Sequence, residues 1–214
     1  MITAGIDIGS ISTKAALLAD GEILASRVIF TGYNAEAAGR TALAEALAQA
    51  KLEAAAVERI VATGYGRKSV SFAARSVTEI ACHASGAYFQ NPAVRSVIDI
   101  GGQDSKAIVL TEGGRVENFV MNDKCAAGTG RFLEVMARAL EADLSAFGDL
   151  SARSRNTARI SSLCTVFAES EVISAIAKGE AREDIVAGIH EAIAARIASM
   201  AQRIGVRSPL MMTG

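Results

Sequence analysis

Features that mark several large classes of protein are scarce or absent in this sequence. It has no run of lysine or arginine, and its 22 basic and 23 acidic residues give a formal net charge of -1. Nucleic acids and anionic membranes select basic patches, so the sequence predicts neither partner. No segment approaches the roughly 18 apolar residues of a membrane span, and the N-terminus lacks a secretion signal, so we expect a cytoplasmic protein.

Proline is also rare, with two residues among 214, and charged residues make up only 21% of the chain. Half of the residues are hydrophobic, which excludes a disordered or low-complexity chain and allows a buried core. The length favours one domain, or two small halves that share a ligand cleft.

Cysteine occurs only as Cys82, Cys125 and Cys164. An odd number of cysteines without an export signal argues against a disulfide framework and favours reduced thiols or metal ligands. Cys125 and Cys164 each precede a predicted helix, whose dipole stabilises a thiolate. Their spacing leaves two interpretations open: unrelated buried thiols, or ligands that join those of a second chain around a [4Fe-4S] cluster or a zinc ion. Cys82, beside His83 in an apolar helix, is interpreted as a packed core thiol.

The strongest fold signal is an internal duplication. Residues 5–23 and 97–116 both contain an apolar residue, Asp-Ile-Gly, a polar turn, a lysine, an apolar strand and a second glycine-bearing turn. We therefore expect two similar halves, 1–92 and 93–214. Alternation and turn signals predict strands at 2–8, 15–18, 23–29, 59–63, 96–100, 106–110, 115–121 and 208–213, and helices at 35–51, 78–89, 131–140, from about 168, and 185–204.

The paired Asp-Ile-Gly turns predict a site for a metal-bound polyphosphate. Glycine lets phosphate approach the backbone, hydroxyl groups and lysine bind its oxygens, and an aspartate holds Mg²⁺ through water. Neither turn matches a P-loop or a Rossmann motif, and one such turn by itself would be typical of an ordinary β-hairpin. The candidate phosphate contacts are Gly9, Ser10, Ser12, Thr13 and Lys14 in the first copy, Gly101 and Gly102 in the second, and Gly128, Thr129 and Gly130 at a later helix start.

Six segments make the sequence similar to one known family: GIDIGSISTK, VATGYGR, CHASGA, VIDIGGQDSK, MNDKCAAGTGRFLE and CTVFAESEVIS. They resemble the activators of 2-hydroxyacyl-CoA dehydratases, such as the 2-hydroxyglutaryl-CoA dehydratase activators, with the ATP-binding subunits of benzoyl-CoA reductase as near relatives. The resemblance covers essentially the whole chain. It implies an α/β fold of the acetate kinase, sugar kinase, Hsp70 and actin superfamily, in which two ribonuclease-H-like halves enclose ATP and Mg²⁺.

The resemblance also implies an oxygen-sensitive electron-transfer ATPase. A homodimer would hold one [4Fe-4S] cluster through Cys125 and Cys164 of each chain. It would accept electrons from reduced ferredoxin or flavodoxin and pass them, as ATP is hydrolysed, to an acyl-CoA dehydratase or reductase component. Asp7 and Asp99 match the carboxylates that hold Mg²⁺ through water. Gln103 and Asp104 are the candidates that orient the attacking water.

Three alternatives stay open at this point. A subunit of a benzoyl-CoA reductase-type enzyme would carry the same motifs. A sugar kinase-like phosphotransferase of the same fold would have incidental cysteines, although no separate sugar pocket with a carboxylate base is identifiable. A nucleotide-binding regulator whose dimer holds zinc is the third.

The sequence departs from the superfamily pattern at its last residues. The adenosine segment of the superfamily follows a strand that ends in Thr-Gly-Gly, whereas this sequence stops at Thr213 and Gly214. We expect weakened nucleotide binding and an exposed sheet edge where the remaining segment would pack.

Overall fold

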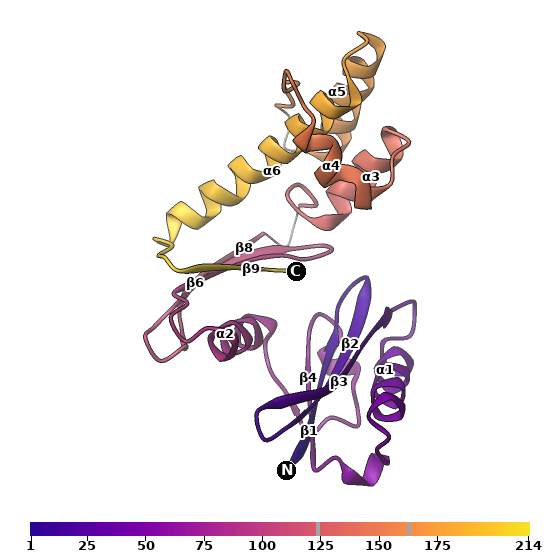
Figure 1. Ribbon diagram of the computed structural model, residues 1–214, viewed down its shortest axis with the longest axis vertical. Coiled ribbons are helices and arrows are strands. Elements are labelled where there is room, and N and C mark those ends of the chain that lie inside the picture. Colours follow the sequence, from indigo (N-terminus) through magenta and orange to yellow (C-terminus); the bar gives the residue numbers. More distant parts are fainter. Residues whose placement is uncertain (123–124, 162–163) are drawn as a thin grey trace. The chain divides into compact units, whose positions relative to one another are not determined.

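The computed structural model describes residues 1–122, 125–161 and 164–214 (Figure 1). These residues form two compact units, Met1–His83 and Ala84–Gly214. The boundary between the units lies within helix α2, Glu79–Gln90, ahead of the division expected between residues 92 and 93. Each unit contains its own sheet.

The first unit is built on a five-stranded sheet with the order β3-β2-β1-β4-β5. Strands β1 to β3 form the predicted antiparallel meander, and β4 and β5 run parallel to β1. One face of the sheet packs against helix α1, with Ile6, Ile8 and Leu17 in the core between them. The elements of this unit are β1 Ile2–Ile8, β2 Ser12–Ala19, β3 Glu22–Phe30, α1 Ala35–Ala50, η1 Ala54–Ala56, β4 Arg59–Thr63, η2 Arg67–Ser69 and β5 Arg75–Ser76.

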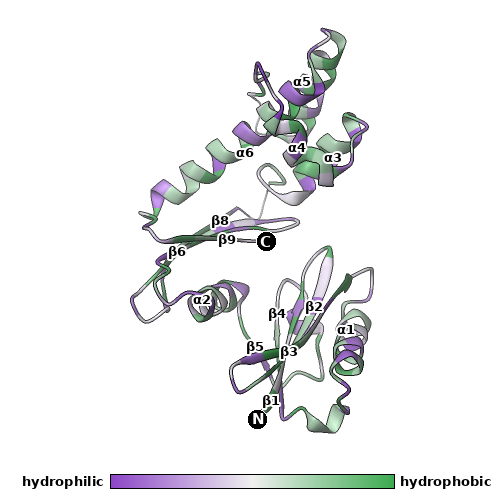
Figure 2. Ribbon diagram, in the orientation of Figure 1, coloured by the Kyte–Doolittle hydropathy of each residue, from purple (hydrophilic) through white to green (hydrophobic). Residues whose placement is uncertain are grey.

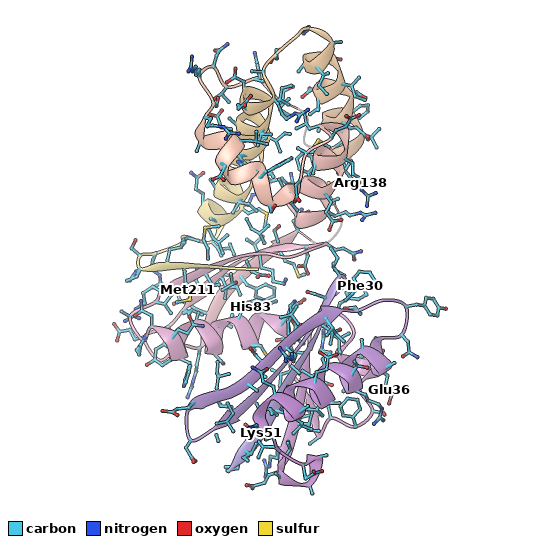
Figure 3. All side chains as sticks on the ribbon, turned by 45° about the vertical axis from the view of Figure 1, so that its right-hand side comes forward. Phe30, Glu36, Lys51, His83, Arg138 and Met211 are labelled. Atoms are coloured by element: carbon cyan, nitrogen blue, oxygen red, sulfur yellow. The ribbon has the colours of Figure 1, made fainter. Side chains whose placement is uncertain are left out.

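Both ends of α1 follow from the local sequence. At the start, the side chain of Asn34 accepts a hydrogen bond from the amide of Ala37 at 3.0 Å, which caps the helix. At the end, Lys51, which is labelled in Figure 3, adopts a left-handed conformation with φ of 56°, and its amide donates back to the last helical turn. The alanine-rich buried face brings the helix close to the sheet.

The second unit repeats this topology in a four-stranded sheet with the order β8-β7-β6-β9. Strands β6, β7 and β8 again form an antiparallel meander, and β9 pairs parallel with β6, as β4 pairs with β1. The predicted duplication is confirmed at the level of strand order. The further elements are β6 Ser96–Ile100, β7 Ser105–Leu110, β8 Val116–Asn122, α3 Gly130–Ala139, η3 Leu144–Ala146, α4 Phe147–Ala152, α5 Thr165–Ala177, α6 Arg182–Arg203 and β9 Leu210–Thr213.

The sheet of the second unit is covered more completely than that of the first. Helix α6 lies on one side of it and α2 on the other (Figure 1). All six residues of β7 are buried, whereas buried and half-buried residues alternate along much of β2. The predicted apolar stripe of α6 faces the core, with Ile185, Ile189 and Ile193 at 1%, 0% and 8% exposure. Hydrophobic and hydrophilic residues accordingly alternate along this helix (Figure 2).

Two short elements, α4 and β5, were not predicted, because neither is long enough to show a periodic pattern. Helix α5 begins at Thr165 rather than near residue 168, since Cys164 already occupies the N-cap position. None of the helices in the described part of the chain is both long and apolar enough to cross a lipid bilayer.

Replacement of Ile6 by alanine tests the core of the first unit, because this side chain is 0% exposed. We expect Ile6→Ala to lower the free energy of unfolding by about 2–5 kcal/mol. The matched change Ile23→Ala, at a side chain that is 62% exposed, should cost less than about 0.5 kcal/mol. Urea denaturation followed by circular dichroism measures both, and equal losses would contradict the assigned core.

Candidate functional site

The two predicted phosphate turns share one backbone geometry. The amide of Gly9 donates to the carbonyl of Ser12 at 3.0 Å, and the amide of Gly101 donates to the carbonyl of Asp104 at 2.9 Å. A Cβ at Gly9 would lie 2.7 Å from the Ser12 carbonyl oxygen, and one at Gly101 would lie 2.8 Å from an Asp104 carboxylate oxygen. Only glycine therefore fits at the first turn, where the close atom belongs to the backbone, and at the second turn any other residue would displace the Asp104 side chain.

In the first unit, Asp7 on β1 is flanked by Lys14 on β2 and Thr63 on β4, its register partners on the two neighbouring strands. Residues paired in register project from the same face of a sheet, so the three side chains form a row. Lys14 Nζ lies 3.1 Å from Asp7 Oδ2, and both side chains are partly exposed, at 45% and 34%. The Thr63 hydroxyl is buried and forms no hydrogen bond with any described residue.

The second unit contains an equivalent row, Lys106, Asp99 and Thr213, in a different environment. Lys106 is only 2% exposed, and its Nζ lies 3.0 Å from Asp99 Oδ2 and 2.6 Å from Asp104 Oδ1. The Thr213 hydroxyl donates to Asp99 Oδ1 at 3.0 Å. Asp99 is thus held by partners on both neighbouring strands.

The buried ammonium group stays charged at neutral pH. Burial by itself would lower the pKa of Lys106, but the hydrogen bond to Asp104 and the charge of Asp99 outweigh it, so the pKa lies above its ordinary value of 10.5. The stabilisation that this raised pKa provides is fully present below pH 10.5 and is lost only as the pH rises through the higher pKa of the folded state.

The other predicted phosphate contacts lie on or beside these turns. Ser10 and Ser12 are partly exposed, and Gln103 is exposed. The Thr13 hydroxyl is buried and lies 2.9 Å from the Thr31 hydroxyl, which in turn donates to the Gly9 carbonyl at 2.9 Å. Thr13 therefore supports the first turn from inside the unit, and its contact with phosphate stays a prediction.

The second phosphate turn is bonded directly to the start of α3. The amides of Gly130 and Arg131 donate to the carbonyls of Gly101 and Gly102, each at 2.9 Å. The Ser105 hydroxyl donates to the carbonyl of Gly128, one residue before the N-cap Thr129. The predicted Gly128–Gly130 segment thus reaches the second turn, although these two amides already have protein acceptors.

Cys125 lies in the loop between β8 and α3, where it is half-buried. The Asn122 amide group donates to the carbonyls of Cys125 and Ala127 at 2.8 Å and 2.9 Å, which holds residues 125–127 against the end of β8. Arg196 of α6 approaches the same asparagine, with Nη2 3.4 Å from Asn122 Oδ1. Cys125 is therefore anchored through its backbone while its thiol is unbonded to another cysteine.

Cys164 is exposed and occupies the N-cap of α5. Its helix is rich in hydrophobic residues (Figure 2), and several of them are exposed: Val166, Phe167, Ile173 and Ile176. Within residues 1–122, 125–161 and 164–214, no three His, Cys, Asp or Glu side chains gather as metal ligands. A four-thiolate site would thus need cysteines from a second chain. Cys82, predicted as a core thiol, is half-buried in α2.

Sequence reasoning missed Thr63, Asn122 and Arg196 as site residues. For the threonine a signal was present, because a Thr-Gly pair ends both β4 and β9 and thus belongs to the duplication. The roles of Asn122 and Arg196 depend on contacts between distant segments and have no sequence signature.

The sequence of this chain is similar to those of several known proteins. The model of the BadF/BadG/BcrA/BcrD ATPase family matches residues 4–214. The activator of lactoyl-CoA dehydratase from Anaerotignum propionicum is 49% identical over 100% of this chain and 83% of its own length. A subunit of benzoyl-CoA reductase from Thauera aromatica is 36% identical over 99% of this chain and 76% of its own length.

The fold of this chain is also similar to those of solved structures. The Acidaminococcus fermentans (R)-2-hydroxyglutaryl-CoA dehydratase component A has a TM-score of 0.96 and 46% identity, with 100% of this chain and 83% of that chain covered. The activator of the 2-hydroxyisocaproyl-CoA dehydratase from Clostridium difficile, with bound ADPNP, has a TM-score of 0.93 and 46% identity, with 99% and 79% covered. A glucokinase of the ROK family from Streptomyces griseus, 17% identical with a TM-score of 0.55 and 99% and 82% coverage, shares the fold alone.

The two lysines offer a matched test of the site's electrostatics. Lys106→Met would leave Asp99, at 3% side-chain exposure, buried without its cation, and should lower the free energy of unfolding by about 3–5 kcal/mol. Lys14→Met removes a partly exposed pair and should cost less than about 1 kcal/mol. Chemical denaturation at neutral pH compares them, and a loss at Lys106 no larger than that at Lys14 would contradict the assigned burial.

Proposed function

The chain belongs to the BadF/BadG/BcrA/BcrD ATPase family, and we propose that this ATPase activates a 2-hydroxyacyl-CoA dehydratase by ATP-driven electron transfer. Relatives that match the whole chain are named as dehydratase activators, which supports an acyl-CoA dehydratase as the partner. The proposed electron donor is reduced ferredoxin or flavodoxin.

The observation that carries the proposal is the bonded link between the second phosphate turn and the Cys125 loop. Gly101 and Gly102 hold the start of α3 through two hydrogen bonds, and Cys125 lies just before that helix. A displacement of the turn when nucleotide is hydrolysed would therefore move the helix start and the loop with it. A plain kinase has no need for a cysteine just before the helix that its phosphate turn holds.

The cysteines suit a [4Fe-4S] cluster shared by a homodimer. Cys125 and Cys164 are free thiols near the starts of α3 and α5, where helix dipoles favour the negative charge of a thiolate-bound cluster. The exposed Val166 and Phe167 next to Cys164 provide an apolar surface for a second copy of the chain. When bound, the cluster supplies the low-potential electron.

In the proposed nucleotide site, Asp7 and Asp99 hold hydrated Mg²⁺. Gln103 or Asp104 orients the attacking water. The shared turn geometry and the ADPNP-bound relative support this assignment. The proposed phosphate contacts are Gly9, Ser10, Ser12, Thr13, Lys14, Gly101, Gly102, Gly128, Thr129 and Gly130.

A second candidate is the ATP-binding subunit of a benzoyl-CoA reductase-type enzyme, favoured by the similarity to the Thauera aromatica protein. The two candidates differ in assembly: a reductase subunit would copurify with the other subunits of its enzyme, whereas an activator would purify as a separate homodimer.

Metal analysis of anaerobically purified protein tests the cluster. We expect a dimer with about two irons and two acid-labile sulfides per chain. Cys125→Ala and Cys164→Ala should each lose most of the iron, because each removes two of the four ligands in the dimer. Cys82→Ala, the matched control, should keep it. Zinc at about one per dimer, or a metal-free monomer, would overturn the electron-transfer proposal.

Replacement of Asp7 by asparagine tests the nucleotide site. Asp7→Asn keeps the shape of the side chain but removes the charge that attracts hydrated Mg²⁺, so we expect the turnover number for ATP hydrolysis to fall about a hundredfold. The matched change Asp20→Asn, in an exposed turn, should leave it within about twofold. Phosphate release at saturating ATP measures both, and an active Asp7→Asn variant would remove Asp7 from the mechanism.

A further inference from the structure

The two equivalent rows, Lys14–Asp7–Thr63 and Lys106–Asp99–Thr213, differ in the hydrogen bonding of their threonine. In the second unit, Thr213 donates to Asp99 at 3.0 Å. In the first, Thr63 occupies the same register position beside Asp7, yet its buried hydroxyl forms no hydrogen bond with any described residue. A buried hydroxyl without a partner destabilises the fold, so its retention calls for a reason other than stability.

We propose that Thr63 is a positioning residue for Asp7. In the nucleotide-bound state its hydroxyl donates to the Asp7 carboxylate, as Thr213 does to Asp99, and so orients that carboxylate toward the hydrated Mg²⁺ of the nucleotide. The inference rests on the proposed role of Asp7 in holding Mg²⁺, and it adds a residue to that role.

The packing around Asp7 supports this assignment. A Cβ on Gly64 would collide with Asp7 Oδ1, so this oxygen lies directly against the Thr63–Gly64 segment. The other oxygen, Oδ2, faces Lys14 at 3.1 Å. The segment that carries Thr63 therefore lies against the carboxylate that the proposal has it orient.

The chemistry of the first row also fits a hydrated cation. Asp7 is 34% exposed and its ion-pair partner Lys14 is 45% exposed, so the Asp7 carboxylate is reachable by a water of the Mg²⁺ shell. A donor on the far side of such a carboxylate fixes its direction, as partners behind a metal ligand do in other proteins. Loss of that donor should therefore weaken nucleotide binding in the presence of Mg²⁺ without lowering the stability of the fold.

Nucleotide binding by Thr63→Val tests the inference, because valine keeps the shape and removes the hydroxyl. We expect the dissociation constant for ADP in Mg²⁺, measured by calorimetry, to rise about tenfold. In EDTA it should change by less than about twofold, and thermal unfolding should occur no lower than in the unmodified protein. Thr63→Ser, which restores the hydroxyl, should recover most of the affinity in Mg²⁺.

Thr213→Val is the matched control, since it removes a hydroxyl that already has a partner. This variant should unfold at a lower temperature, as Asp99 loses a donor. The inference would be overturned if Thr63→Val and the unmodified protein bound ADP with equal affinity in Mg²⁺. It would also be overturned if Thr63→Val lost as much ADP affinity in EDTA as in Mg²⁺. ADP binding by the unmodified protein that is indifferent to Mg²⁺ would overturn the inference together with the assigned role of Asp7. Absence of iron would overturn only the cluster.

Discussion

A single buried ammonium group organises the second unit. Lys106 is held between Asp99, in the middle of the sheet, and Asp104, at the end of the phosphate turn, so the turn cannot move without disturbing a buried ion pair. The turn in turn holds the start of α3 through its Gly101 and Gly102 carbonyls. A continuous series of polar contacts therefore leads from the centre of the sheet to the loop that carries Cys125.

The same motif gives a different electrostatic result in the first unit. Lys14 stands in the register position of Lys106, but it is 45% exposed because its strand is buried on one face only. The position equivalent to Asp104 is Ser12, so among the described residues Lys14 pairs with Asp7, whereas Lys106 pairs with both Asp99 and Asp104. The ion pair beside the first turn is therefore more exposed than the pair of Lys106 with Asp99 beside the second.

Alternation and turn residues were sufficient to predict both meanders, and the repeated Asp-Ile-Gly segment predicted that they share one topology. The spacing of Ile185, Ile189 and Ile193 likewise predicted which face of α6 is buried. The burial of Lys106 was not predictable from the repeated motif, because Lys14 in the other copy is 45% exposed. All six residues of β7 are buried, whereas buried and half-buried residues alternate along much of β2, so the burial of each lysine depends on the packing around its strand.

The two cysteines are tied to different parts of the second unit. The Cys125 loop is held by Asn122 and follows the phosphate turn through α3. Before Cys164, both the amide and the hydroxyl of Ser161 donate to Glu171 of α5 at 2.8 Å, so that segment follows its own helix. Because α3 and α5 pack against each other, side-chain packing connects the helix held by the phosphate turn to the helix that begins after Cys164. Among the described residues, hydrogen bonds therefore lead from the phosphate turn to the helix that follows Cys125, and hydrophobic packing leads on to the helix that follows Cys164.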